Sequence, residues 1–215
     1  LIAGLDVRAV RRGAAMALDT ALNAAGTRDC PPAVGAAIAV GLLREHGIAQ
    51  TVLMPYADAL APFGRWFRQL WAESLGKDGA GTTPQGALGA TDQHSQLQLW
   101  LGGPRDKMFT LITLDREGSG QAVPVDLAAD DDLAYFQGRT LGDLMAAEQR
   151  ATAKTLAANG CPVRLFQLET LDEVSLGALL MHFMIETIIT GGLMAIDPFD
   201  QPAVAAGPHV KGETA

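Results

Sequence analysis

A carboxylate and an imidazole stand on either side of a loop rich in glycine and threonine in this 215-residue chain. Glu73 precedes the loop, and His94 follows it. A partly desolvated glutamate can move a proton between adjacent carbon atoms, and a histidine can exchange a proton with a sugar ring oxygen. If both side chains face one pocket, the pair predicts proton-transfer chemistry on a small hydroxylated ligand.

Spacing alone leaves a structural interpretation of both residues open. A glutamate near the end of an apolar-faced helix is often a solvated cap, and a single histidine near a helix start is often structural. Gln69 lies four residues before Glu73, so a helix would place both on one side. The four histidines lack the paired spacing of metal ligands, and the loop matches neither GxxxxGK[ST] nor GxGxxG. The sequence therefore predicts no metal site.

Helices and short apolar strands alternate along the chain. This alternation predicts an α/β fold in which helices flank a parallel sheet with right-handed crossovers. A glycine- and aspartate-rich segment at 116–132 is the expected exposed excursion. We expect helices at 7–25, 31–46, 60–75, 91–101, 140–159 and 171–196, with strands at 48–54, 108–114 and 162–168.

Composition restricts the partners that this chain can bind. A formal net charge of −8 and the lack of a basic block argue against nucleic acid. The apolar run from Leu179 to Ile196 has the length of a membrane span, but His182 and Glu186 within it would make insertion costly. We therefore expect a buried helix in a soluble, cytoplasmic protein with no membrane contact. Because the chain begins with Leu1, we also expect a fragment or a processed form.

Three strings carry a resemblance to a known family: AESLGKD at 72–78, GTTPQGALGATDQHSQLQL at 81–99 and IDPFDQPAV at 196–204. They resemble the C-terminal half of the glucose-6-phosphate isomerase family, and the similarity extends from about residue 7 to residue 204. The resemblance implies that residues 1–215 form one C-terminal, three-layer sugar-isomerase (SIS) domain with a five-stranded parallel sheet. It also implies a homodimer that acts on a sugar phosphate in glycolysis and gluconeogenesis.

The resemblance also implies roles for individual residues. Glu73 corresponds to the catalytic base that moves a proton between C1 and C2 through a cis-enediol. His94 corresponds to the ring-opening histidine, which reaches into the active site of the neighbouring subunit. Gln69 and Gln201 correspond to glutamines that contact the substrate. We expect no metal and no redox cofactor, because proton transfer on a sugar that already carries its phosphate needs neither.

Two departures from the family pattern leave alternatives open. The family has a catalytic lysine nine residues after the phenylalanine of FDQ, whereas this chain has Pro208 there. We expect the next lysine, Lys211, to contact the substrate. The N-terminal half with its phosphate loop is also absent, so it must be supplied in cis or in trans. A catalytically incomplete sugar-phosphate-binding or regulatory module is therefore the main alternative to an isomerase domain. A further alternative is that the chain is the structural dimerisation half of a split enzyme.

Overall fold

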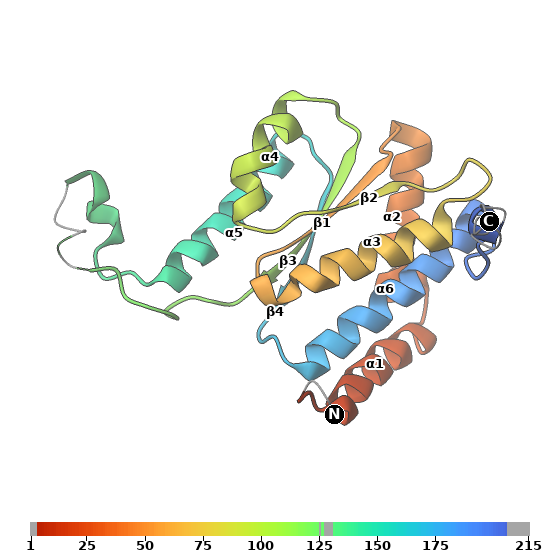
Figure 1. Cartoon of the computed structure of the whole chain (residues 1–215), viewed down its shortest axis with the longest axis horizontal. Coiled ribbons are helices and arrows are strands. Elements are labelled where there is room, and N and C mark those ends of the chain that lie inside the picture. The colour runs from red at the N-terminus through yellow and green to blue at the C-terminus, as the bar shows by residue number, and fades with distance from the viewer. Residues whose placement is uncertain (1–3, 125, 127–130, 206–215) are drawn as a thin grey trace, which may run out of the picture.

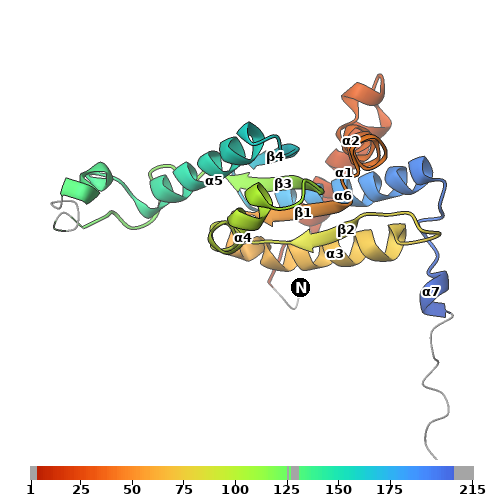
Figure 2. The same ribbon diagram turned by 90° about the horizontal axis from the view of Figure 1, so that it is seen from above.

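The computed structural model describes residues 4–124, 126 and 131–205, and a parallel sheet lies at its centre. The sheet has four strands in the order β2-β1-β3-β4 (Figures 1 and 2). Each neighbouring pair of strands is parallel. The strands are β1 (Gln50–Pro55), β2 (Thr83–Gly86), β3 (Lys107–Leu114) and β4 (Val163–Leu168).

Helices cover both faces of this sheet and give the fold three layers. The helices are α1 (Val7–Leu22), α2 (Pro31–His46), α3 (Ala61–Leu75), α4 (Thr91–Gly102), α5 (Leu141–Ala158), α6 (Glu173–Met194) and α7 (Pro202–Ala205). Side chains of α2, α3 and α6 form one hydrophobic cluster with β1 and β3. Side chains of α4 and α5 form a second cluster with the same two strands. The predicted α/β class, with a parallel sheet flanked by helices, is confirmed.

The sheet differs from the prediction in one strand. Three of the four strands fall where apolar runs predicted them, whereas β2 lies inside the glycine- and threonine-rich loop. Its sequence, TPQG, is short and carries no apolar pattern, because only its backbone is needed to pair with β1. The resemblance implied five strands, and the residues that the structure describes form four.

Among the described residues, α6 is the one helix that is long and apolar enough to cross a membrane. It packs against α1, α2 and α3. Glu186 on this helix is fully buried, and its carboxylate lies 2.8 Å from Nη2 of Arg164 and 3.1 Å from Nε2 of His182. Burial raises the pKa of Glu186, but the nearby Arg164 guanidinium and His182 lower it by more than burial raises it. The resulting pKa is below the usual range of a glutamate.

α1 lies on the outer side of α6, and two glycines allow the close approach of the two helices. A Cβ atom on Gly13 would lie 1.8 Å from the backbone oxygen of Val174, and one on Gly177 would lie 1.9 Å from that of Val10. The contact is therefore backbone against backbone on both sides. Any side chain at either position would push the helices apart.

We predict that Gly177→Ala destabilises the chain by about 1–3 kcal/mol, because the added methyl group cannot fit at this crossing. Gly192→Ala is the matched control on the same helix, since a Cβ atom there meets nothing within 4 Å. It should stabilise the chain by up to about 1 kcal/mol through helix propensity. Urea denaturation of the two variants measures both changes, and equal effects would contradict the proposed close approach.

Candidate active site

Glu73 forms the centre of a small polar cluster at the end of α3. Gln69 Nε2 donates a 3.0 Å hydrogen bond to Oε1 of Glu73, and Gln201 Nε2 donates one of 3.0 Å to Oε2. All three residues are exposed. The structure therefore brings together three of the predicted site residues from two distant parts of the chain, and each carboxylate oxygen accepts one amide hydrogen bond.

The apolar face of α3 determines where Glu73 points. Phe63, Phe67, Trp71 and Leu75 recur at intervals of four residues and are buried against the sheet and α6. Residues 69 and 73 lie on the opposite side of the helix and face solvent. Glu73 is also in the last turn of α3, where the helix dipole disfavours a negative charge. A stabilising role as a helix cap is therefore a poor explanation for a carboxylate at this position.

Thr82 fixes the loop that follows α3. Its hydroxyl accepts a 2.9 Å hydrogen bond from the indole nitrogen of Trp71 and lies 2.9 Å from the hydroxyl of Thr51 on β1. These contacts are buried and connect helix, loop and sheet. They hold the end of α3, and with it Glu73, at the edge of the sheet where the strands begin.

The chain that carries Gln201 is shaped by the end of α6. Ala195 ends the helix in the left-handed conformation, at φ 59°. The amide of Ile196 then donates to the carbonyl oxygen of Gly191, and the Ile196 side chain packs on the core. The carboxylate of Asp197 accepts a 2.8 Å hydrogen bond from the amide of Phe199. This turn directs residues 197–201 back toward the end of α3.

Lys77 is a buried charged residue near the Glu73 cluster. It was not among the site residues predicted from the sequence. Its ammonium group lies between the end of α3 and the segment 197–200. The signal available in the sequence was its place in the AESLGKD string, four residues after Glu73.

Within one chain, His94 lies far from the Glu73 cluster. It is exposed in the second turn of α4, which starts just after β2 ends. α3 runs back along the sheet and ends where β2 begins, so Glu73 and His94 are at opposite edges of the sheet (Figure 1). Neither of the polar residues at the start of α4, Thr91 and Asp92, caps this helix. Ala90 is the N-cap residue without a side-chain hydrogen bond, and Asp92 accepts from the amide of Leu88 instead.

Two residues of the sequence analysis lie outside the described part of the chain. These are Lys211, which was predicted to contact substrate, and Pro208, which occupies the place of the family lysine. Their positions relative to Glu73 remain predictions from the sequence.

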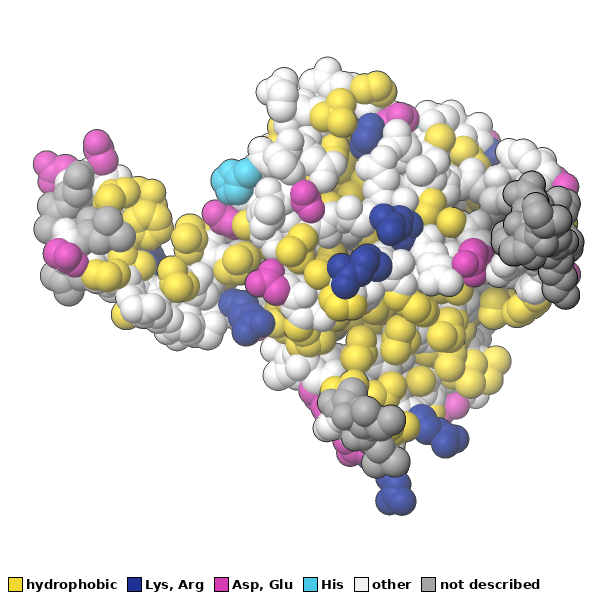
Figure 3. All heavy atoms as spheres, viewed as in Figure 1, with side chains coloured by type: hydrophobic (Ala, Val, Ile, Leu, Met, Phe, Trp, Pro, Cys, Tyr) yellow, Lys and Arg dark blue, Asp and Glu magenta, His cyan; other side chains and the backbone are white. Residues whose placement is uncertain are grey.

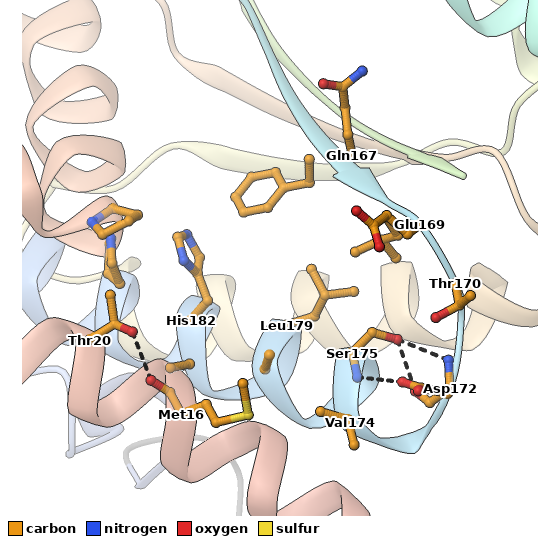
Figure 4. A pocket seen from close by; sticks show the side chains of 16 residues that line it. Met16, Thr20, Gln167, Glu169, Thr170, Asp172, Val174, Ser175, Leu179 and His182 are labelled. Carbon is orange, nitrogen blue, oxygen red and sulfur yellow. Dashed lines mark hydrogen bonds between the residues drawn. The ribbon is translucent and has the colours of Figure 1, made fainter. Parts of the chain in front are cut away.

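A groove of about 580 Å³ lies between α1, the start of α2, the end of β4 and α6 (Figure 4). Apolar side chains such as Met16, Phe166 and Leu179 line much of it. At the start of α6, Asp172 and Ser175 form reciprocal hydrogen bonds, and the bond from the Ser175 amide lowers the pKa of Asp172. None of the four predicted site residues that the structure describes lines this groove. The Glu73 cluster is instead an open surface, so its carboxylate is not desolvated by the described residues.

The fold is a three-layer α/β domain in which helices flank a parallel sheet. No protein-family model matches the sequence. A glucose-6-phosphate isomerase of Rubrobacter xylanophilus is 40% identical over 209 residues, which are 97% of this chain and 48% of that protein. A probable glucose-6-phosphate isomerase of Halobacterium salinarum is 42% identical over 99% of this chain and 48% of its own length.

Solved structures agree with these relatives. A hypothetical protein from Thermus thermophilus superposes with a TM-score of 0.84 at 34% identity, over 94% of this chain and 49% of its own. A glucose-6-phosphate isomerase from Chlamydia trachomatis has a TM-score of 0.71 over 92% of this chain and 40% of its own, and at 19% identity it shows the shared fold. The chain is thus a relative of glucose-6-phosphate isomerases, and it spans about half the length of the curated relatives it matches.

We predict that the exposed cluster contributes little to the stability of the chain. Gln69→Ala and Gln201→Ala should each change the free energy of unfolding by less than about 0.5 kcal/mol, because their partners stay solvated. Glu73→Gln should be neutral or slightly stabilising, because it removes a negative charge from a helix C-terminus. Urea denaturation measures these changes. A loss above about 1 kcal/mol for Glu73→Gln would support the structural interpretation of this residue.

Proposed function

We propose that this chain is the C-terminal sugar-isomerase half of a glucose-6-phosphate isomerase. Joined to the missing half, it interconverts glucose 6-phosphate and fructose 6-phosphate in glycolysis and gluconeogenesis, in the cytoplasm. The observation that carries the proposal is the Glu73 carboxylate held by Gln69 and Gln201. It occurs in a chain of which 97% and 99% match 48% of the length of two proteins bearing that name.

In the proposed reaction, Glu73 acts as the base. Its carboxylate removes the proton from C2 of the open-chain aldose while the carbonyl oxygen O1 takes up a proton from water, which gives a cis-enediol. The carboxylate then returns a proton to C1 while the O2 hydroxyl gives up its proton to water, which gives the ketose. The two glutamine amides orient the carboxylate so that one face of it stays directed at the sugar carbons. Their donors are neutral, so the described residues form no ion pair with Glu73 that would compete with the proton.

The open surface around Glu73 supports the need for a second structural unit. A base works best where water is excluded, yet Glu73 is exposed in this chain. Met16 of α1 and Met184 and Ile188 of α6 are also exposed, and hydrophobic side chains gather over these two helices in Figure 3. An uncovered apolar area of this kind fits a surface that another unit covers. The missing half would supply that cover together with the groups that bind the phosphate.

The separation of Glu73 and His94 supports a site shared between two chains. The two residues lie at opposite edges of one sheet, so one copy of the domain does not bring them together. In a homodimer, His94 of one subunit would open the sugar ring beside Glu73 of the other. The remaining candidate is a binding or regulatory module without turnover. The proline at position 208, where the family has a lysine, favours it.

We predict that joining this chain to the N-terminal half of a relative produces aldose–ketose isomerisation. Glu73→Gln in the joined protein should lower kcat by about 100- to 10,000-fold, because an amide cannot accept the carbon-bound proton. Glu45→Gln, an exposed glutamate on α2, is the matched control and should have no effect. Lys211→Ala shows in the same assay whether this lysine replaces the one lost at Pro208. A joined protein that binds the sugar phosphate without turnover would favour the binding module.

We predict that two inactive variants complement each other. In a mixture of Glu73→Gln and His94→Ala subunits, a hybrid dimer has one site with both residues intact if the histidine acts across the interface. Random mixing would then restore about a quarter of the wild-type activity, since half the dimers are hybrids with one working site of two. No recovery after subunit exchange, verified by native mass spectrometry, would show that His94 does not act in trans.

A further inference from the structure

We propose that Lys77 is the positioning residue of the Glu73 cluster. It ties the end of α3 to the segment that carries Gln201, and thereby sets the contact between the base and its glutamine. The geometric part of this inference concerns the chain alone, whereas its effect on turnover rests on the proposed function.

Each N–H donor of the Lys77 ammonium group has an oxygen partner. Nζ donates a 3.0 Å hydrogen bond to the carbonyl oxygen of Ser74 and one of 2.5 Å to that of Asp197. It also lies 3.1 Å from Oδ1 of Asp200. A lysine has three N–H donors, and three oxygens surround this one. The side chain is only 6% exposed, so these oxygens replace the water that the charge has lost.

Two of the three partners are adjacent to residues of the cluster in the sequence. Ser74 follows Glu73 directly, and Asp200 directly precedes Gln201. One buried charge therefore joins the neighbour of the carboxylate to the neighbour of its amide partner. A shift of either neighbour would alter the 3.0 Å contact between Gln201 Nε2 and Glu73 Oε2.

The loop after α3 turns sharply and directs Lys77 inward. Asp78 has a φ of 51° and Gly81 one of 101°. A Cβ atom on Gly81 would lie 2.7 Å from the backbone oxygen of Leu75, so the loop folds closely over the helix end. The amide of Ala80 donates to the carbonyl oxygen of Lys77 and closes the turn. This conformation keeps the start of the Lys77 side chain against the end of α3.

The segment before Gln201 has little other anchorage after its first residues. Ile196 packs on the core, and Pro198 lies against Gly191, but Phe199 is 77% exposed and Val204 is 69% exposed. Residues 199–204 are all exposed, so Pro198 is the last partly buried residue of the described segment. The loss of Lys77 should release residues 199–201 while α3, α6 and the core stay in place.

The first test uses NMR on this chain and does not depend on activity. The side-chain amide signals of Gln201 are assigned from their loss in Gln201→Leu. In Lys77→Met, which keeps the length and removes the charge, these signals should move to the position of a free, solvated glutamine. Lys107→Met is the matched control. Lys107 is also buried, with 7% of its side chain exposed, and is paired with Asp106 at the start of β3. Unchanged Gln201 signals in folded Lys77→Met would overturn the proposal.

The second test measures turnover in the joined protein. Lys77→Met should lower kcat by about 100-fold with little change in KM, because a small displacement of the base affects the chemical step more than binding. Lys107→Met should keep both constants. An equal loss of kcat in both variants would overturn the positioning role. If the wild-type joined protein is inactive, the proposed function fails, and the NMR result still decides the role of Lys77.

Asp200→Asn keeps the test decisive if Lys77→Met does not fold. The Asp200 side chain is 55% exposed, so the substitution leaves the interior unchanged and weakens one of the three contacts. It should shift the Gln201 signals in the same direction by a smaller amount. Gln201 signals identical to those of the wild type in this variant would overturn the proposal.

Discussion

The packing of α3 on the sheet and α6 is the constraint on which the rest of the candidate site depends. The ring of Phe67 lies edge-on to that of Phe183 on α6, with centroids 5.2 Å apart, and stands 5.4 Å from that of Trp71. These large buried side chains fix the rotation of α3 about its own axis, because any rotation would expose aromatic area to water. Once the rotation is fixed, residues 69 and 73 must point away from the core. The position of the carboxylate is thus set by hydrophobic packing on the opposite side of the helix.

The parallel topology then determines which residues can meet. Every crossover helix runs back along the sheet, so the ends of α3 and α6 arrive at the edge where the strands begin. This brings Glu73 and the segment with Gln201 together across 128 residues of sequence. The same topology places the start of α4, with His94, at the other edge. One copy of the domain therefore keeps the two residues apart.

Sequence reasoning succeeded where burial leaves a periodic pattern. The apolar runs located β1, β3 and β4, and the four-residue spacing placed Gln69 beside Glu73. It failed where the determining interaction is not periodic. β2 is held by backbone pairing, and Lys77 in a glycine-rich loop has the pattern of a solvated residue although it is buried. The link between Glu73 and Gln201 came from the family resemblance, since no local pattern relates residues so far apart.

Two glutamates of this chain show how environment separates a structural carboxylate from a candidate base. Glu186 lies in the interior beside Arg164, and the guanidinium keeps its pKa low despite burial. A carboxylate held in this way stays ionised and cannot easily gain and lose a proton. Glu73 instead accepts hydrogen bonds from two neutral amides at an open surface. The nearby positive charge of Lys77 is directed at Asp200 and at two carbonyl oxygens. The fold thus fixes the position of Glu73 with a cation that contacts its neighbours, and the described residues that donate to its two oxygens are neutral amides.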